Sequence, residues 1–222
     1  YAPGDSAVIA FGDSITDGAY ATENENHRWP DYLAARLASD AGTQKAGVLG
    51  VVNVGIGGNR VLLDGYGPNA VSRVDLDVRV SSGARYMIVL ESINDIGRYV
   101  RDHQPYGDLT QRLEMGLAQL VAQAHQHNIL VFGATLTPYQ GCGYYSPAGD
   151  EVRQAVNEWI RTGQTFDGVV DFDKAVRDPQ NPLRYAPQYD SCDHLHPKDA
   201  GYQAMANAID LSLFTKKRAT AT

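Results

Sequence analysis

The sequence predicts an α/β protein, a three-layer α/β/α sandwich whose mainly parallel sheet has five strands. Short apolar runs rich in β-branched residues indicate strands that are buried on both faces. Amphipathic helical patterns separate these runs, which is typical of βαβ units. The chain has 222 residues, of which 43% are apolar, so it can bury the core of one domain. We expect that domain to span residues 1–222.

Five apolar runs are the expected strands. The first four are strongly apolar, whereas the fifth is weaker. In an open parallel sheet, functional sites form at the carboxyl ends of the strands, so the segments that follow each run are the candidate loops. The expected strands cover residues 7–11, 48–54, 85–90, 129–134 and 169–172.

Helices are expected between the strands, because apolar residues recur there at a spacing of three or four. The first pattern covers residues 29–37 and has Pro30 in its first turn, where proline is tolerated. Further patterns cover residues 109–121 and 152–160, and a last helix is expected over residues 199–211.

The charge of the chain restricts its partners. A formal net charge of −7 argues against binding to nucleic acid, and the basic run at residues 216–218 is expected to be a solvated end. No apolar stretch approaches the ~20 residues of a membrane-spanning helix, so no membrane span is predicted. The sequence does not determine the oligomeric state, and our expectation is a monomer.

Two features bear on the compartment. The chain begins with Tyr1 and has no signal-peptide pattern, which fits either a mature secreted form or a trimmed chain, and we expect a secreted protein. Cys142 and Cys192 are the only cysteines, and one disulfide between them would suit an oxidising compartment. Two unpaired thiols are the alternative. Their spacing does not match a structural zinc site.

Ser14 is the candidate nucleophile, because the segment Gly12-Asp13-Ser14 directly follows the first expected strand. A serine hydroxyl needs a base to take its proton, and the base needs a third group to orient it. His196 and Asp193 stand three residues apart before the last expected helix, a spacing that fits a base and its orienting carboxylate. Asp13 is an alternative carboxylate, but it adjoins the nucleophile and is expected to point away from it.

Two further segments offer hydrogen-bond donors for an oxyanion. A glycine-rich segment that includes Gly58 follows the second strand and exposes backbone N–H groups, and Asn94 follows the third strand with a side-chain amide. Each alone is more often a plain turn or cap. Arg60 stands where a dinucleotide-binding loop has its third glycine, and no third metal ligand accompanies His194 and His196. We therefore predict no cofactor and no metal.

The order of these segments resembles the SGNH, or GDSL-like, hydrolase family. Gly12-Asp13-Ser14 matches its first block, Gly58 its second, Asn94-Asp95 its third and Asp193-X-X-His196 its last. The runs at residues 29–31 and 92–97 are similar to the secreted bacterial and fungal esterases of this family. The resemblance covers residues 12–196, and four blocks in the family's order are far more specific than any single block.

The resemblance implies a flavodoxin-like sandwich and ester hydrolysis without a metal or organic cofactor. By position, Ser14 is then the nucleophile, His196 the base and Asp193 its partner. The backbone N–H groups of Ser14 and Gly58 and the Asn94 side chain then form the oxyanion hole.

One position departs from the family. Ser92 stands where the third block usually has glycine. If that backbone requires a positive φ, Ser92 adds strain of ~1–2 kcal/mol. Alternatively, the Ser92 hydroxyl contacts the substrate.

Several residues near the blocks are candidate substrate contacts. The loop at residues 138–147 is rich in tyrosine and glycine and is expected to border the site, although a plain surface loop is nearly as good an interpretation. Arg98 is a further candidate, with an ordinary surface salt bridge as its alternative. The other candidates are Asp13, Asn59, Arg60, Ser92, Tyr139 and Tyr144.

The predicted function is that of a serine esterase that forms an acyl-enzyme on Ser14. The expected substrates are short, acetyl-type acyl esters of carbohydrates or small alcohols. One alternative is a lysophospholipase or thioesterase of longer acyl chains, which needs an apolar channel that the sequence does not clearly show. Another is a non-catalytic carbohydrate-binding protein on the same scaffold, in which Ser92 is a sign of decay.

Overall fold

The structure is a computed structural model that describes residues 6–102 and 105–215. The basic run at residues 216–218 and the two ends of the predicted domain lie outside the described residues. None of the described helices is long and apolar enough to cross a membrane.

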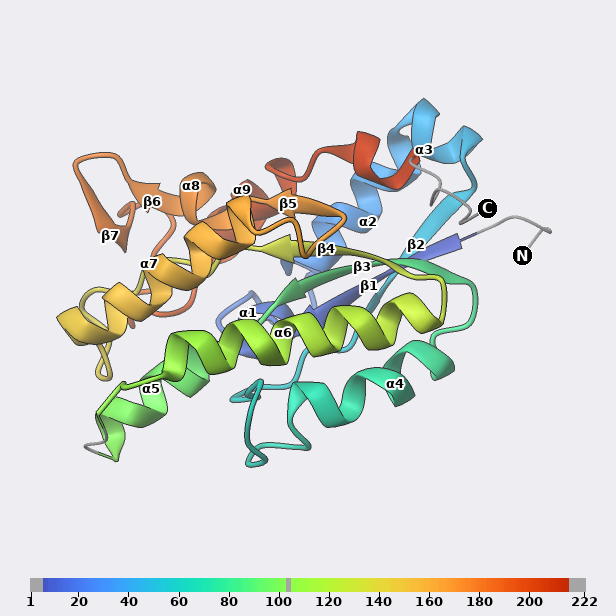
Figure 1. The fold of residues 1–222 in the computed structure, drawn as a ribbon. Helices are drawn as coiled ribbons and strands as arrows, with labels where there is room; N and C mark the ends of the chain where they lie inside the picture. Colours follow the sequence, from blue (N-terminus) through green and yellow to red (C-terminus); the bar gives the residue numbers. More distant parts are fainter. Residues whose placement is uncertain (1–5, 103–104, 216–222) are drawn as a thin grey trace.

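The centre of the molecule is a five-stranded sheet in the order β2-β1-β3-β4-β5, in which every neighbouring pair is parallel. This arrangement confirms the predicted fold class and all five expected strands. Figure 1 shows the sheet running through the middle of the molecule with helices on both sides. The strands are β1 (Ser6–Gly12), β2 (Val48–Asn53), β3 (Ala84–Leu90), β4 (Leu130–Ala134) and β5 (Gly168–Val170).

Side chains of β1, β3 and β4 alternate between two separate hydrophobic clusters. Ile9 and Phe11 of β1 pack into one cluster with α4, α6 and α7, whereas Val8 and Ala10 pack into the other with α2, α8 and α9. This alternation follows from the two-residue period of a strand. The helices of the first layer are α4 (Ala70–Val80), α6 (Leu109–Gln126) and α7 (Pro147–Thr162), and those of the second are α2 (Trp29–Ser39), α8 (Phe172–Val176) and α9 (Asp199–Asn207).

The remaining elements connect these layers. Two short helices, α1 (Ser14–Asp17) and α5 (Ile93–Arg101), begin just after β1 and β3. A third, α3 (Ala41–Lys45), precedes β2, and a 3₁₀-helix (Leu211–Thr215) ends the described chain. Strands β6 (Arg177–Asp178) and β7 (Asn181–Tyr185) form a separate antiparallel pair.

The sequence patterns located α2, α6 and α7 but not α1, α3, α4, α5, α8 or the β6–β7 pair. The short elements span too few residues for a helical or alternating period to be visible. In α4, the buried face includes Arg73, which interrupts its apolar pattern. The last helix ends at Asn207 instead of residue 211, because Asp210 caps the 3₁₀-helix by accepting from the Ser212 N–H.

Candidate active site

Ser14 is placed by the turn between β1 and α1. Asp13 caps α1, where its carboxylate accepts the Ile15 N–H at 2.9 Å, and Ser14 is the first helical residue. Ser14 therefore lies at the carboxyl end of β1. Burial raises the pKa of Asp13 to about 7, although the hydrogen bond from Ile15 opposes this shift.

The loop before α9 brings a histidine to this serine. The Ser14 Oγ lies 2.8 Å from His196 Nε2, and His196 Nδ1 lies 2.6 Å from Asp193 Oδ2. The two ring nitrogens thus contact different groups, one a hydroxyl and the other a carboxylate. This is the geometry in which a carboxylate holds the imidazole so that Nε2 can accept a proton from the hydroxyl.

Asp193 is held firmly within its own loop. Its Oδ1 accepts the backbone N–H groups of Leu195 at 2.9 Å and His196 at 2.8 Å, and the Ser191 hydroxyl at 2.9 Å. Burial by itself raises the pKa of Asp193, but the hydrogen bonds from His196 and Leu195 outweigh it and lower the pKa below its usual value. Asp193 is therefore ionised at neutral pH and can orient the His196 ring.

Tyr20, which sequence analysis did not single out, lies against the histidine. The rings of Tyr20 and His196 are stacked, with their centroids 5.4 Å apart. Tyr20 has a left-handed backbone, with φ of 64°, and 61% of its surface is exposed. Its ring thus forms the outer wall beside the imidazole. Only the folded turn brings it there, because neither periodicity nor a motif marks this residue.

Hydrogen-bond donors gather next to Ser14. The backbone N–H groups of Ser14 and Gly58 donate to no other described residue. The Asn94 Nδ2 donates to the Asn59 carbonyl at 3.0 Å and lies 3.4 Å from Asp13 Oδ2, near the limit for a hydrogen bond. One amide hydrogen of Asn94 is thus held only weakly.

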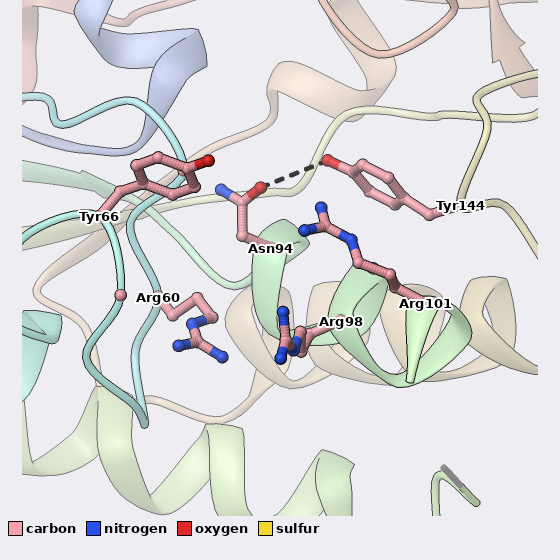
Figure 2. Close-up of a pocket in the computed structure, with 9 residues that line it drawn as sticks. Arg60, Tyr66, Asn94, Arg98, Arg101 and Tyr144 are labelled. Carbon is pink, nitrogen blue, oxygen red and sulfur yellow. Dashed lines mark hydrogen bonds between the residues drawn. The ribbon is translucent and has the colours of Figure 1, made fainter. Parts of the chain in front are cut away.

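Gly58 is required at its position by both backbone and space. Its φ is +74°, and a Cβ there would lie 2.6 Å from a ring carbon of Tyr66. A larger residue would therefore strain the backbone and displace the ring. Figure 2 shows Tyr66 and Tyr144 on opposite sides of Asn94, with the Tyr144 hydroxyl donating to Asn94 Oδ1 at 3.3 Å.

Buried Arg73 joins the segments that carry these donors. Its guanidinium donates to the carbonyls of Gly12 and Val54, both at 2.9 Å, and to Asn59 Oδ1 at 2.9 Å. It also stacks on Phe11, 3.8 Å from the ring centre. Sequence analysis missed Arg73. The detectable signal is an arginine on the otherwise apolar face of α4.

Two further carboxyl groups are buried beside Asp13. Asp95 accepts the backbone N–H groups of Val61 at 2.8 Å and Leu62 at 3.1 Å, so it ties the loop after Gly58 to α5. Burial raises the pKa of Asp95 to about 6. Burial and the neighbouring carboxyl groups raise the pKa of Glu91 well above its usual value. Sequence analysis missed Glu91, and the detectable signal is an acidic residue directly after an apolar strand.

The structure buries four of the seven candidate substrate contacts. Asp13, Asn59, Ser92 and Tyr139 are at most 1% exposed, so they lie beneath the site and do not face a substrate. The Asn59 amide serves the loop instead, because it donates to the carbonyls of Tyr66 and Pro68. The other three candidates, Arg60, Arg98 and Tyr144, line a cavity beside Asn94.

Ser92 has the backbone conformation that favours glycine. Its φ is 110°, and its hydroxyl has no hydrogen-bond partner in the described part of the chain. Asn94 nevertheless reaches Asn59 and Tyr144. The hydroxyl is fully buried, so the prediction that it contacts the substrate is wrong.

The predicted disulfide between Cys142 and Cys192 is also wrong. Both cysteines are free, Cys142 half-buried and Cys192 exposed. Cys142 packs against the hydrophobic cluster of α6 and α7, and burial raises the pKa of its thiol. The ring of His194 lies against Gly141, next to Cys142, and pairs with Asp190. His194 and His196 thus contact separate carboxylates.

Comparison with known families agrees with this geometry. The sequence model of the GDSL-like lipase/acylhydrolase family matches residues 10–204. The chain belongs to this family. It is therefore a carboxylic ester hydrolase, and the resemblance noted in the four sequence blocks is confirmed. No curated protein matches the sequence significantly.

Solved structures share the fold of this family member. An aryl esterase from M. smegmatis superposes with a TM-score of 0.69 at 16% identity, covering 91% of this chain and 95% of that one. Est24, a carbohydrate acetylesterase from Sinorhizobium meliloti, has a TM-score of 0.68 at 16% identity, covering 92% and 96%. A lipolytic protein of the G-D-S-L family from Desulfitobacterium hafniense DCB-2 has a TM-score of 0.67 at 21% identity, covering 92% and 97%.

Proposed function

We propose that this protein hydrolyses short acyl esters of carbohydrates or small alcohols through an acyl-enzyme on Ser14. The observation that carries the proposal is the continuous hydrogen-bonded line from Ser14 Oγ through His196 to Asp193, with distances of 2.8 and 2.6 Å. Such a line activates a hydroxyl that is otherwise a weak nucleophile.

In this mechanism, Ser14 Oγ attacks the ester carbonyl while His196 Nε2 takes its proton. The carbonyl oxygen becomes an oxyanion, which accepts hydrogen bonds from the Ser14 and Gly58 N–H groups and from the Asn94 amide. His196 then gives its proton to the departing alcohol, and the acyl group stays on Ser14. Water, deprotonated by His196, attacks the acyl-enzyme and releases the carboxylic acid.

The cavity beside Asn94 supports short acyl substrates. Its volume is about 190 Å³, below the ~300–1,000 Å³ of typical ligand pockets. A Cβ on Gly97 would lie 2.2 Å from the Tyr144 ring, so this ring packs directly on α5 and closes that side. The fold is also that of a carbohydrate acetylesterase, Est24.

The test is the initial rate of hydrolysis of p-nitrophenyl esters from acetyl to palmitoyl, with Ser14→Ala beside the parent protein. We expect the highest kcat/KM on the shortest esters and a loss of at least ~10³-fold in Ser14→Ala. The matched control is Ser72→Ala, because Ser72 is exposed on α4. An optimum at palmitoyl would instead support the long-chain alternative. Carbohydrate binding without turnover that depends on Ser14 would support the non-catalytic alternative.

Asn94→Ala tests the oxyanion hole. Because loss of one such donor typically lowers the rate by ~10²–10³-fold, we expect kcat to fall by that factor with little change in the free energy of unfolding. Nearly full turnover in this variant would remove Asn94 from the mechanism.

A further inference from the structure

The cavity beside Asn94 carries a concentration of positive charge. Its lining includes three arginines and no carboxylate among the described residues. The whole chain has a net charge of −7, so this charge is a local feature and not a consequence of composition. Figure 2 shows the guanidinium groups of Arg60 and Arg98 below Asn94 and that of Arg101 to its right, toward Tyr144.

The carboxylates near these arginines lie outside the cavity. Arg98 pairs with Asp102, and the Arg60 guanidinium donates to the Asp64 carbonyl oxygen. Both aspartates line the neighbouring groove instead. Within residues 6–102 and 105–215, Arg101 has no carboxylate partner. The cavity therefore holds a surplus of positive charge.

The arginines lie on the same elements as the proposed oxyanion donors. Asn94, Arg98 and Arg101 follow one another along one face of α5, at spacings of four and three residues. Arg60 comes two residues after Gly58 in the loop that Arg73 and Asp95 hold in place. At a rise of 1.5 Å per residue, Arg98 lies about 6 Å and Arg101 about 10 Å beyond Asn94 along the axis of α5.

We propose that this cavity binds a carboxylate group that the ester substrate carries on its acyl or its alcohol part. The inference rests on the proposed function, because it names the class of ester that the same site prefers. A guanidinium matches a carboxylate with two parallel hydrogen bonds, which a neutral group cannot replace. The rings of Tyr66 and Tyr144 provide apolar surface for the carbon atoms between the carboxylate and the ester.

The experiment compares charged and neutral esters of similar size. On the acyl side, monophenyl glutarate is compared with phenyl hexanoate; on the alcohol side, 3-acetoxybenzoate is compared with its methyl ester. The background rate is taken from Ser14→Ala. We expect kcat/KM to be about tenfold higher for the charged member of one pair, and this preference to decrease as NaCl is added. The pair that shows the preference identifies the part of the substrate that carries the charge.

Variants connect the preference with the arginines. Arg98→Gln and Arg101→Gln should each lower the charged-to-neutral ratio of kcat/KM about fivefold or more, since each removes a charge-assisted hydrogen bond. Arg79→Gln is the matched control, because Arg79 is exposed in the last turn of α4 and pairs with Asp75. If the arginine variants do not fold, competitive inhibition of the parent protein by benzoate, but not by benzamide, supports the proposal.

Equal rates within both pairs would overturn the carboxylate site, as would arginine variants that behave like Arg79→Gln. The proposed function would still stand in that case, provided that hydrolysis of phenyl acetate is lost in Ser14→Ala. Hydrolysis that survives in Ser14→Ala would overturn the proposed function itself.

Discussion

Two groups of charged side chains lie in the interior of this molecule, and they differ in the ratio of carboxyl groups to arginines. Beneath the active site, the three carboxyl groups of Asp13, Glu91 and Asp95 lie near a single buried arginine, Arg73. Between α7 and α8, which belong to different layers, Arg153 donates both to Asp150 at 2.7 Å and to Asp173 at 2.9 Å. The first group has an excess of acids, whereas each acid of the second has an arginine.

The charged group between α7 and α8 joins these two helices to each other and to the end of β4. Arg153 also donates to the Leu136 carbonyl after β4, and Arg161 joins Asp171 to Asp173. Burial acts to raise the pKa of Asp171, but the hydrogen bonds from Arg161, Lys174 and Thr135 together outweigh it and lower the pKa. A balanced group of this kind ties α7 to α8.

In the group beneath the site, burial instead raises the pKa values of the carboxyl groups and so favours their protonated forms. Burial raises the pKa of Asp13 to about 7 and that of Asp95 to about 6. The same acids hold the loops that carry Ser14, Gly58 and Asn94. Carboxyl groups with strongly raised pKa values are thus concentrated where hydrogen-bond donors must be positioned, and they lower the stability of the protein near neutral pH.

The largest expected effects come from removing the arginine of each group. Arg153→Met leaves Asp150 without its arginine and leaves Asp173 with only the partly exposed Arg161 and Arg177, so the free energy of unfolding should fall by about 3–5 kcal/mol while kcat of the folded protein stays close to the parent's. Arg73→Met should also destabilise the protein, but kcat should fall by about 10²-fold, because the donor segments shift. Urea unfolding and kcat, measured on both variants, check this contrast. Equal losses of kcat in the two variants would remove the distinction.

A smaller effect, with a pH dependence, is expected from Glu91→Gln. The pKa of Glu91 is raised in the folded protein above its usual 4.5, so the folded state binds more protons than the unfolded state as pH rises above that value. Stability therefore decreases as pH rises through this range. Glutamine does not titrate, so the variant should be more stable than the parent at pH 8, with the difference vanishing near pH 4.

The measurement for Glu91→Gln is urea unfolding from pH 4 to pH 8. Glu151→Gln is the matched control, because Glu151 is exposed on α7, and it should follow the parent at every pH. If the two variants show the same profile, the carboxyl group of Glu91 does not contribute to the pH dependence.

The smallest effect is expected at Ser92, which borders the acid group. Ser92→Gly removes the strain of a side chain at φ of 110° and a buried hydroxyl that has no partner among the described residues. The free energy of unfolding should therefore increase by ~1 kcal/mol, and the melting temperature should rise. Ser81→Gly, at a φ of −84°, should instead destabilise the protein. A loss of stability in Ser92→Gly would mean that the serine has a contact other than those described.

Much of the fold was predictable because its signals are local. Each of the five strands is a continuous apolar run, and each of the long helices α2, α6 and α7 repeats apolar residues at helical spacing. The four sequence blocks are also local, which is why they identified the family. Helix α4 was missed because Arg73 and Asp77, which pair with each other, interrupt its apolar pattern. Arg73 is buried through its contacts with the distant Gly12 and Val54 carbonyls.

The disulfide was predicted wrongly because it depends on more than local sequence patterns. Two cysteines in a chain invite pairing, but a bond depends on the distance and direction of their Cβ atoms. In the folded protein, Cys142 turns toward the hydrophobic cluster and Cys192 toward solvent. Nothing in the spacing of fifty residues contains this information.

By itself, the sequence determined which segments become strands, in which order the four blocks follow them, and hence the family and the type of reaction. The tertiary structure alone decided that Ser14 and His196, 182 residues apart, lie 2.8 Å from each other. It also decided that three acids are buried near Arg73 and that three arginines gather beside Asn94. The physical reason is that strand and helix patterns depend on neighbouring residues, whereas burial, pKa values and the position of a charge depend on contacts between segments far apart in the chain.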